Sequence, residues 1–181
     1  MEFIYSSVCI EWIRILRFEI EKPEDSTEIE VLLDNAFGLG RTNLSSYQLR
    51  IGNQPIEELS MVAKEENGSI VGSIRFCPVW VGQNEFKVLL LGPIAVHHTH
   101  QGEGIGSYLI SAGVSKAREL DWEAILLVGD EPYYSKFGFS VIKTVEFPPP
   151  TDPNRILCLE LTEGTREMLK GRVRIPSAKD C

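Results

Sequence analysis

Residues 89–107, which read LLLGPIAVHHTHQGEGIGS, constrain the fold of this chain more than any other segment. An apolar, β-branched run ends at a glycine-rich turn, and a segment with helical periodicity follows the turn. This order predicts a buried strand whose carboxyl end leads into the N-terminus of a helix. The unpaired N–H groups and the dipole of a helix N-terminus both favour negative charge, so we expect a phosphate-bearing ligand there.

The glycine spacing narrows the kind of ligand. Gly102, Gly104 and Gly106 alternate, so the turn does not match the dinucleotide fingerprint G-x-G-x-x-G. No Lys-Ser or Lys-Thr pair follows a glycine here, so the triphosphate loop G-x-x-x-x-G-K-[ST] is absent as well. From Gln101 onward the segment reads Q-x-x-G-x-G, and Ser107 follows it.

Two motifs resemble those of the GNAT superfamily of acetyl-CoA-dependent N-acyltransferases. The family's Q/R-x-x-G-x-G/A loop binds the pyrophosphate of coenzyme A, and YYSKFGF at residues 133–139 is similar to the family's Y-x-K-x-G-F ending. The resemblance covers residues 18–161. It implies an α/β (α+β) fold: a mixed, mostly antiparallel central sheet, helices on both faces, and a splayed parallel strand pair that holds acyl-CoA. Acetyl-CoA is then the cosubstrate, and no metal is expected.

The resemblance also implies which residues contact acetyl-CoA. They are Ile94, Ala95, Val96, Gln101, Gly102, Glu103, Gly104, Ile105, Gly106, Ser107 and Tyr134. Many members of the family carry Arg or Lys where this chain has Glu103, and an inward-facing carboxylate would repel a pyrophosphate. Glu103 therefore bears on how tightly coenzyme A binds, whereas the main-chain donors still favour the loop as the pyrophosphate site.

An amine that attacks a thioester directly needs a donor for the carbonyl and an acid for the departing thiolate. By resemblance, the main-chain N–H of Val96 is the donor and Tyr134, four residues before Gly138, is the acid. Aromatic packing at a helix start is the alternative role for Tyr134.

The general base is left unassigned. His97, His98 and His100 cluster after the predicted strand, and histidine titrates near neutral pH. The H-H-x-H spacing in a turn directs the three side chains apart, which favours exposed or packing histidines over a metal site. The acidic alternatives are Glu57, Glu58, Asp130 and Glu131.

Hydrophobic periodicity and turn residues predict the remaining elements. We expect strands at residues 18–20, 60–65, 70–81, 86–96, 124–128, 139–147, 156–161 and 172–175, and helices at 23–37, 104–120, 132–137 and 165–170. Strands 139–147 and 156–161 are expected to pair antiparallel. Gly92-Pro93 interrupts strand 86–96, and proline inside a sheet is confined to edges and bulges, so a bulge is predicted there; a loop kink is the alternative.

Length and charge bound the class of protein. The 181 residues suit an extension at residues 1–17 and a single acetyltransferase domain at 18–181. A net charge of −8 argues against partners such as nucleic acid or an anionic membrane. Four scattered cysteines without C-x-x-C, and no apolar run of about 18 residues, favour a cytoplasmic protein without disulfides.

Three functions remain open on sequence. The leading one is acetyl transfer to a primary amine in a ternary complex. The alternatives are a non-catalytic acyl-CoA sensor and a transferase for a longer acyl group or a non-amine acceptor. The acceptor is unknown, and segments 38–57 and 147–154, which carry no motif, are expected to select it. The protein is expected to be a monomer or a homodimer.

Overall fold

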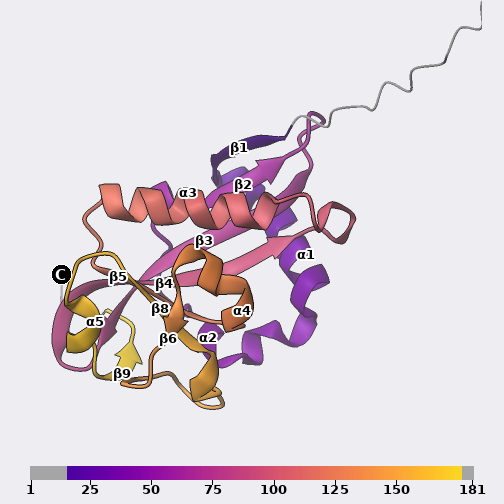
Figure 1. The fold of residues 1–181 in the computed structure, drawn as a ribbon. Coiled ribbons are helices and arrows are strands. Elements are labelled where there is room, and N and C mark those ends of the chain that lie inside the picture. Colours follow the sequence, from indigo (N-terminus) through magenta and orange to yellow (C-terminus); the bar gives the residue numbers. More distant parts are fainter. Residues whose placement is uncertain (1–15, 177–181) are drawn as a thin grey trace, which may run out of the picture.

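In the computed structural model, which describes residues 16–176, the strands form a nine-stranded mixed sheet (Figure 1). The strands are β1 (Arg17–Ile20), β2 (Met61–Lys64), β3 (Ile70–Val81), β4 (Asn84–Val96), β5 (Ala124–Val128), β6 (Ser140–Val141), β7 (Val145–Glu146), β8 (Ile156–Glu160) and β9 (Gly171–Arg174). Their order is β1-β2-β3-β4-β5-β8-β6, and β9 pairs with β3 and β7. Within the described part, β4–β5 and β7–β9 are the parallel pairs.

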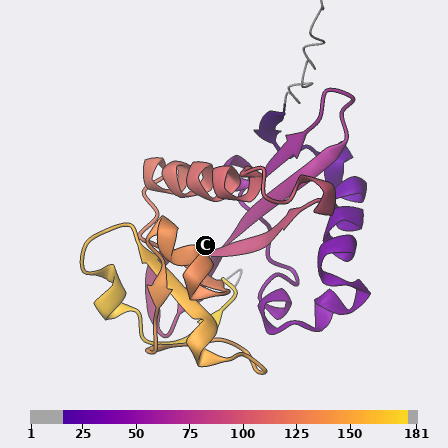
Figure 2. The ribbon, with the colours of Figure 1, turned by 45° about the vertical axis from the view of Figure 1, so that its right-hand side comes forward.

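Helices cover both faces of this sheet. They are α1 (Ser26–Phe37), α2 (Ser45–Gln48), α3 (Ile105–Glu119), α4 (Glu131–Tyr134) and α5 (Thr165–Met168). Successive side chains of a strand point to opposite faces. Val62 on β2 packs in one cluster with Ile29 of α1, whereas Ala63 packs in another with Leu109 of α3. The two long helices therefore lie on opposite faces (Figure 2), and the predicted fold class is confirmed.

Strand β4 is buried on both sides, which explains its near-continuous apolar run. Leu89 and Leu91 belong to the core beneath α3, whereas Val88 and Leu90 belong to the core beside β8 and β9. Its partner β5 is registered against it only from Val88 to Leu90.

The predicted bulge in β4 is present. Ile94 is opposite Ile74 of β3 and Leu91 is opposite Phe76, so β4 carries one more residue than β3 across this interval. The extra residue falls at Gly92-Pro93. A bulge bends its strand, and beyond Leu90 no residue of β5 is registered against β4. The two parallel strands therefore diverge at the bulge and leave a gap between them.

One expected pairing is confirmed only in part. Ser140 and Val141 (β6) pair antiparallel with β8 as expected, but segment 139–147 does not continue as a single strand. Beyond them, the carbonyl of Thr144 accepts from the N–H of Gly171, at 2.8 Å. These contacts turn the chain away from β8, and β7 pairs in parallel with β9.

Residues 1–15 of the predicted extension at 1–17 lie outside the described part of the chain. Arg17 is the first residue of β1. Among residues 16–176, no helix is long and apolar enough to cross a membrane.

Candidate active site

The glycine-rich loop positions the N-terminus of α3 at the end of β4. Gly102 and Gly104 have φ values of 87° and 84°, in the left-handed region that favours glycine. The first helical hydrogen bond runs from the N–H of Tyr108 to the carbonyl of Gly104. The amides in the first turn of α3, at residues 105–107, consequently have no acceptor within the helix. This is the geometry of an anion site.

The main chain of β4 turns toward the gap after the bulge. Antiparallel pairs alternate between hydrogen-bonded and non-hydrogen-bonded ones. The N–H of His97 donates to the carbonyl of Val71, so its neighbour Val96 belongs to a non-hydrogen-bonded pair with Gly72. The main-chain groups of Val96, and by the same alternation those of Ile94, point away from β3 and into the gap.

The other predicted cosubstrate residues differ in their placement. The alternation directs the main chain of Ala95 toward β3, and its buried side chain packs beneath α1. Gln101 and Glu103 are exposed in the loop. Ile105 is buried in the core, so only its amide is available to a ligand.

Lys136 brings a positive charge to the first turn of α3. Its Nζ donates to Ser107 Oγ at 3.2 Å and lies 4.1 Å from the centre of the Tyr133 ring. Sequence reasoning gave Lys136 no role, although it is the lysine of the Y-x-K-x-G-F motif. The N-terminus of a helix carries partial positive charge, so a second positive charge is not expected beside a helix that merely needs capping, and the lysine favours an anionic ligand there.

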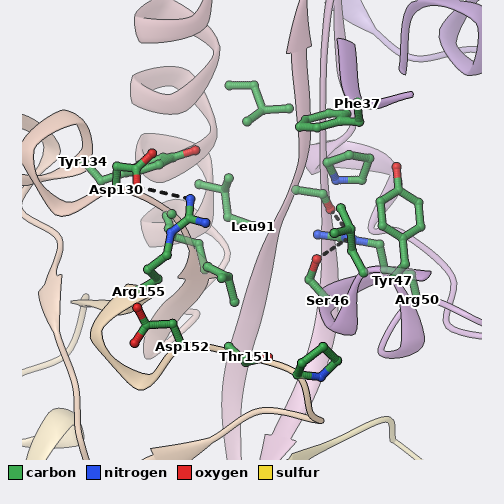
Figure 3. Close-up of a pocket in the computed structure, with 18 of the residues that line it drawn as sticks. Phe37, Ser46, Tyr47, Arg50, Leu91, Asp130, Tyr134, Thr151, Asp152 and Arg155 are labelled. Atoms are coloured by element: carbon green, nitrogen blue, oxygen red, sulfur yellow. Dashed lines mark hydrogen bonds and ion pairs between the residues drawn. The ribbon is translucent and has the colours of Figure 1, made fainter. Parts of the chain in front are cut away.

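A cavity of about 500 Å³ opens where β4 and β5 diverge (Figure 3). Its floor is the bulge of β4 and the end of β5, and its two walls come from segments far apart in the sequence. The lining residues are Leu91, Gly92, Pro93, Ile94, Leu127, Val128 and Gly129 on the floor, Phe37, Asn43, Leu44, Ser46, Tyr47 and Arg50 on one wall, and Asp130, Tyr134, Pro150, Thr151, Asp152 and Arg155 on the other. Both segments expected to select an acceptor therefore line it.

Tyr134 is held in this cavity by its aromatic neighbours. Its ring packs edge-on against Tyr133 and Phe139, with centroid distances of 5.0 and 5.9 Å. Burial, reinforced by Tyr133 and Asp130, raises the pKa of Tyr134 to about 12. The phenol is therefore protonated at neutral pH and can donate a hydrogen bond.

Of the candidate bases, Asp130 alone lines this cavity, and its carboxylate pairs with Arg155 at 3.2 Å. Glu131 instead accepts from the N–H of Val141. Glu57 and Glu58 belong to the 3-10 turn Glu57–Leu59.

The histidines lie elsewhere. His97, Thr99 and His100 form a chain of hydrogen bonds that ends on Glu65, at the opening between α1 and the ends of β2 and β3. In the part of the chain that the structure describes, no group of three or more His, Cys, Asp or Glu side chains is arranged to hold a metal ion. Cys77 and Cys158 are buried free thiols.

Arg50 was also missed by sequence reasoning. It follows α2 in a segment that has no motif, and its Nε donates to the carbonyl of Gly92 at 2.9 Å. The guanidinium thereby reaches the bulge of β4 from 42 residues away in the sequence.

Comparison with known proteins finds similarity to acetyltransferases. A family model described as "Acetyltransferase (GNAT) domain" matches residues 57–141. The uncharacterized N-acetyltransferase YhbS of Escherichia coli K12 is 28% identical over 122 residues, which are 67% of this chain and 72% of that protein. The uncharacterized N-acetyltransferase YjhQ of the same strain is 28% identical over 124 residues, 67% of this chain and 68% of its own.

Solved structures share the fold. The crystal structure of a GNAT family acetyltransferase from Brucella melitensis, in complex with acetyl-CoA, has a TM-score of 0.68 and 29% identity, and the match covers 92% of this chain and 99% of that one. The structure of Escherichia coli YhbS in complex with CoA has a TM-score of 0.77 and 23% identity, with 90% of each chain covered.

Proposed function

We propose that this chain, which belongs to the GNAT superfamily of acetyltransferases, transfers the acetyl group of acetyl-CoA to a primary amine by direct attack in a ternary complex. One observation carries the proposal: the gap between β4 and β5 is bordered by outward-facing main-chain groups, by the first turn of α3 and by a protonated tyrosine. We further propose that residues 18–181 are one domain that acts in the cytoplasm as a monomer or homodimer.

The first turn of α3 and its loop would bind the pyrophosphate. The amides of residues 105–107 supply donors, the hydroxyl of Ser107 adds another, and Lys136 adds a positive charge. The main chain of Ile94 and Val96 would pair with the amides of the pantetheine arm, as a neighbouring strand would. The bound acetyl-CoA and CoA of the Brucella melitensis and Escherichia coli structures support acetyl-CoA as the ligand.

In the transfer step, the N–H of Val96 would donate to the thioester carbonyl oxygen, where negative charge develops. The amine nitrogen forms a bond to the carbonyl carbon while the carbon–sulfur bond breaks. Tyr134 would donate its phenol proton toward the departing sulfur, a role that its raised pKa permits at neutral pH. The amine loses a proton to complete the amide. Of the candidate bases, Asp130 lines the cavity, and we assign no base.

The test is release of the CoA thiol from acetyl-CoA, followed with a thiol reagent in the presence of a panel of primary amines. Amine-dependent release, with one acetylated product per thiol by mass spectrometry, is the expected result. Binding of acetyl-CoA without release by any amine would favour the acyl-CoA sensor. Release with longer acyl-CoA thioesters only would favour the other transferase.

A further inference from the structure

The cavity at the β4 bulge has walls of different charge. One wall, built from the residue before α4 and the residues before β8, carries Asp130, Asp152 and Arg155, and Asp130 pairs with Arg155 at 3.2 Å. The other wall, built from α2 and the residues around it, carries Arg50. Figure 3 shows Asp130 and Arg155 on one side of the cavity and Arg50 on the opposite side.

Arg50 is held in place by three contacts that leave much of its guanidinium free to bind a ligand. Its Nε donates to the Gly92 carbonyl at 2.9 Å, and its Nη1 donates to Ser46 Oγ at 3.3 Å. Its guanidinium carbon lies 4.9 Å from the centre of the Tyr47 ring. A guanidinium has five N–H donors, so these bonds leave three, including both on Nη2.

No carboxylate within residues 16–176 forms an ion pair with Arg50. Glu30, which lines a second cavity beside it, is bound by Arg41 and Arg75. Burial lowers the pKa of Arg50 to about 10, against an attraction from Cys77 and Tyr47 that raises it. The guanidinium is therefore charged at neutral pH, in a place where water solvates it poorly and no acid compensates it. Arg50 is half-buried, and a partly desolvated charge without an anionic partner carries a cost that a ligand anion would reduce.

We propose that Arg50 binds a carboxylate of the acceptor, so that the acceptor is a small primary amine that also carries a carboxylate. The planar fork of a guanidinium matches a carboxylate, which can accept two parallel hydrogen bonds from it. The amine end would then lie toward Tyr134, and Asp130 and Asp152 suit its positive charge before deprotonation. This inference rests on the proposed acetyl transfer and assigns its acceptor class.

The test uses pairs of amines that differ only in the anionic group. The probes are glycine and glycinamide, β-alanine and β-alaninamide, L-phenylalanine and L-phenylalaninamide, with O-phosphoethanolamine and ethanolamine as a phosphate pair. The ratio of kcat/KM for carboxylate over amide is measured for the wild type, Arg50→Met and Arg50→Lys. An amide neighbour makes the amine less basic, so a preference for the carboxylate cannot arise from easier deprotonation.

The wild type is expected to prefer the carboxylate in at least one pair. Arg50→Met should lower that ratio about 10- to 100-fold, the value of a charge-assisted hydrogen bond, because activity on the carboxylate falls more than activity on the amide. Arg50→Lys should retain part of the preference. Arg172→Met removes an exposed guanidinium from β9 and gives the protein the same net charge as Arg50→Met. This control should leave the ratio unchanged.

Two results would overturn the inference while acetyl transfer stands. One is a ratio that does not depend on Arg50, and if activity on both members of each pair falls equally, Arg50 holds the bulge. The other is a dependence confined to the phosphate pair. If no amine is acetylated, the same pairs are titrated calorimetrically into the CoA-loaded protein. Carboxylate binding that Arg50→Met abolishes would then support the acceptor site without the proposed reaction, and its absence would overturn both.

Discussion

At the scale of single residues, the position of Tyr134 is set by what surrounds its ring. Tyr133 and Phe139 pack edge-on against it, and Gly129 lies against the ring. A Cβ built on Gly129 would be 2.4 Å from Tyr134 Cε2, so only glycine admits the ring in this position. The position of the hydroxyl is thus set by the packing of the ring.

Tyr134→Phe keeps this packing and removes only the hydroxyl. We predict that kcat falls by about 100-fold or more, the contribution of a general acid, while acetyl-CoA binds as before. Steady-state kinetics of thiol release and calorimetry measure the two quantities. Tyr108→Phe removes a hydroxyl from the half-exposed Tyr108 on α3 and serves as the control. A Tyr134→Phe variant with wild-type kcat would remove Tyr134 from the mechanism.

The raised pKa of Tyr134 has a consequence at alkaline pH. The unfolded phenol ionises near pH 10 and the folded one near 12, because burial disfavours the phenolate. Below about pH 10 both forms are protonated and stability does not depend on this group. As the pH rises toward 12, the unfolded state loses the proton first and stability falls. The difference in tyrosinate absorbance between the wild type and Tyr134→Phe should titrate near 12; a midpoint near 10 would contradict the burial.

At the scale of elements, α3 must lie close to β3 for its N-terminus to reach the gap. Gly113 allows this approach, since a Cβ there would be 2.5 Å from the ring of the fully buried Phe76. The same helix meets β3 again at Gly72, where a Cβ would lie 2.7 Å from Ile105 Cγ2. Small residues on both partners therefore fix the distance between helix and sheet.

Gly113→Ala should accordingly destabilise the protein. Overpacking costs about 1–3 kcal/mol, and the better helix propensity of alanine offsets about 1 kcal/mol of it. We expect a net loss of about 1 kcal/mol in urea unfolding. Ser111→Ala, on the exposed face of α3, changes the propensity without the clash and should not destabilise. Equal stability of the two variants would show that α3 can move away from Phe76 without penalty.

A buried ion pair joins the turn before α1 to β2. Lys64 Nζ lies 2.8 Å from Asp25 Oδ1, and their side chains are only 11% and 7% exposed. Burial acts to raise the pKa of Asp25, but hydrogen bonds from Lys64 and the N–H of Lys22 outweigh it and hold the pKa below its usual value. Because Asp25 binds its proton more weakly when folded, this stabilisation is present above about pH 4 and is lost as the pH falls through the folded pKa.

Lys64→Met leaves the Asp25 carboxylate buried without its partner. We predict a loss of about 3–5 kcal/mol at neutral pH, measured by denaturant unfolding. The double variant Asp25→Leu with Lys64→Met should recover part of this loss and should no longer lose stability from this pair in acid. A single variant as stable as the wild type would show that water, not Lys64, compensates the carboxylate.

At the scale of the whole molecule, the sequence predicted what local patterns encode. Alternating glycines and a 3.6-residue period were enough for the loop and α3, and Gly92-Pro93 was enough for the bulge. The predicted partner of residues 145–146 was wrong, because a strand of two residues has too little pattern to indicate which strand it pairs with.

Arg50 was missed for a related reason. Its role depends on a contact with Gly92 across 42 residues, inside a segment without periodicity. Lys136 belongs to the Y-x-K-x-G-F motif, so the sequence could have predicted its positive charge beside α3.

Cosubstrate binding at the first turn of α3 is the central claim, and Gly106 offers the most direct test of it. A Cβ built on Gly106 would lie 3.2 Å from Tyr133 Oη and 3.5 Å from Val96 Cγ2, so a larger side chain there fills the space between α3 and β4. Leucine is compatible with a helix, so Gly106→Leu adds a large side chain without breaking α3. Ser111→Leu places the same side chain on the exposed face of α3 and is the matched control.

The measurement is calorimetric titration of acetyl-CoA into the wild type and these two variants, each checked for an unchanged thermal unfolding transition. We predict that the wild type and Ser111→Leu bind acetyl-CoA with equal affinity and that Gly106→Leu loses binding. Equal binding by Gly106→Leu, or no binding by the wild type, would contradict the assignment of this site to acetyl-CoA.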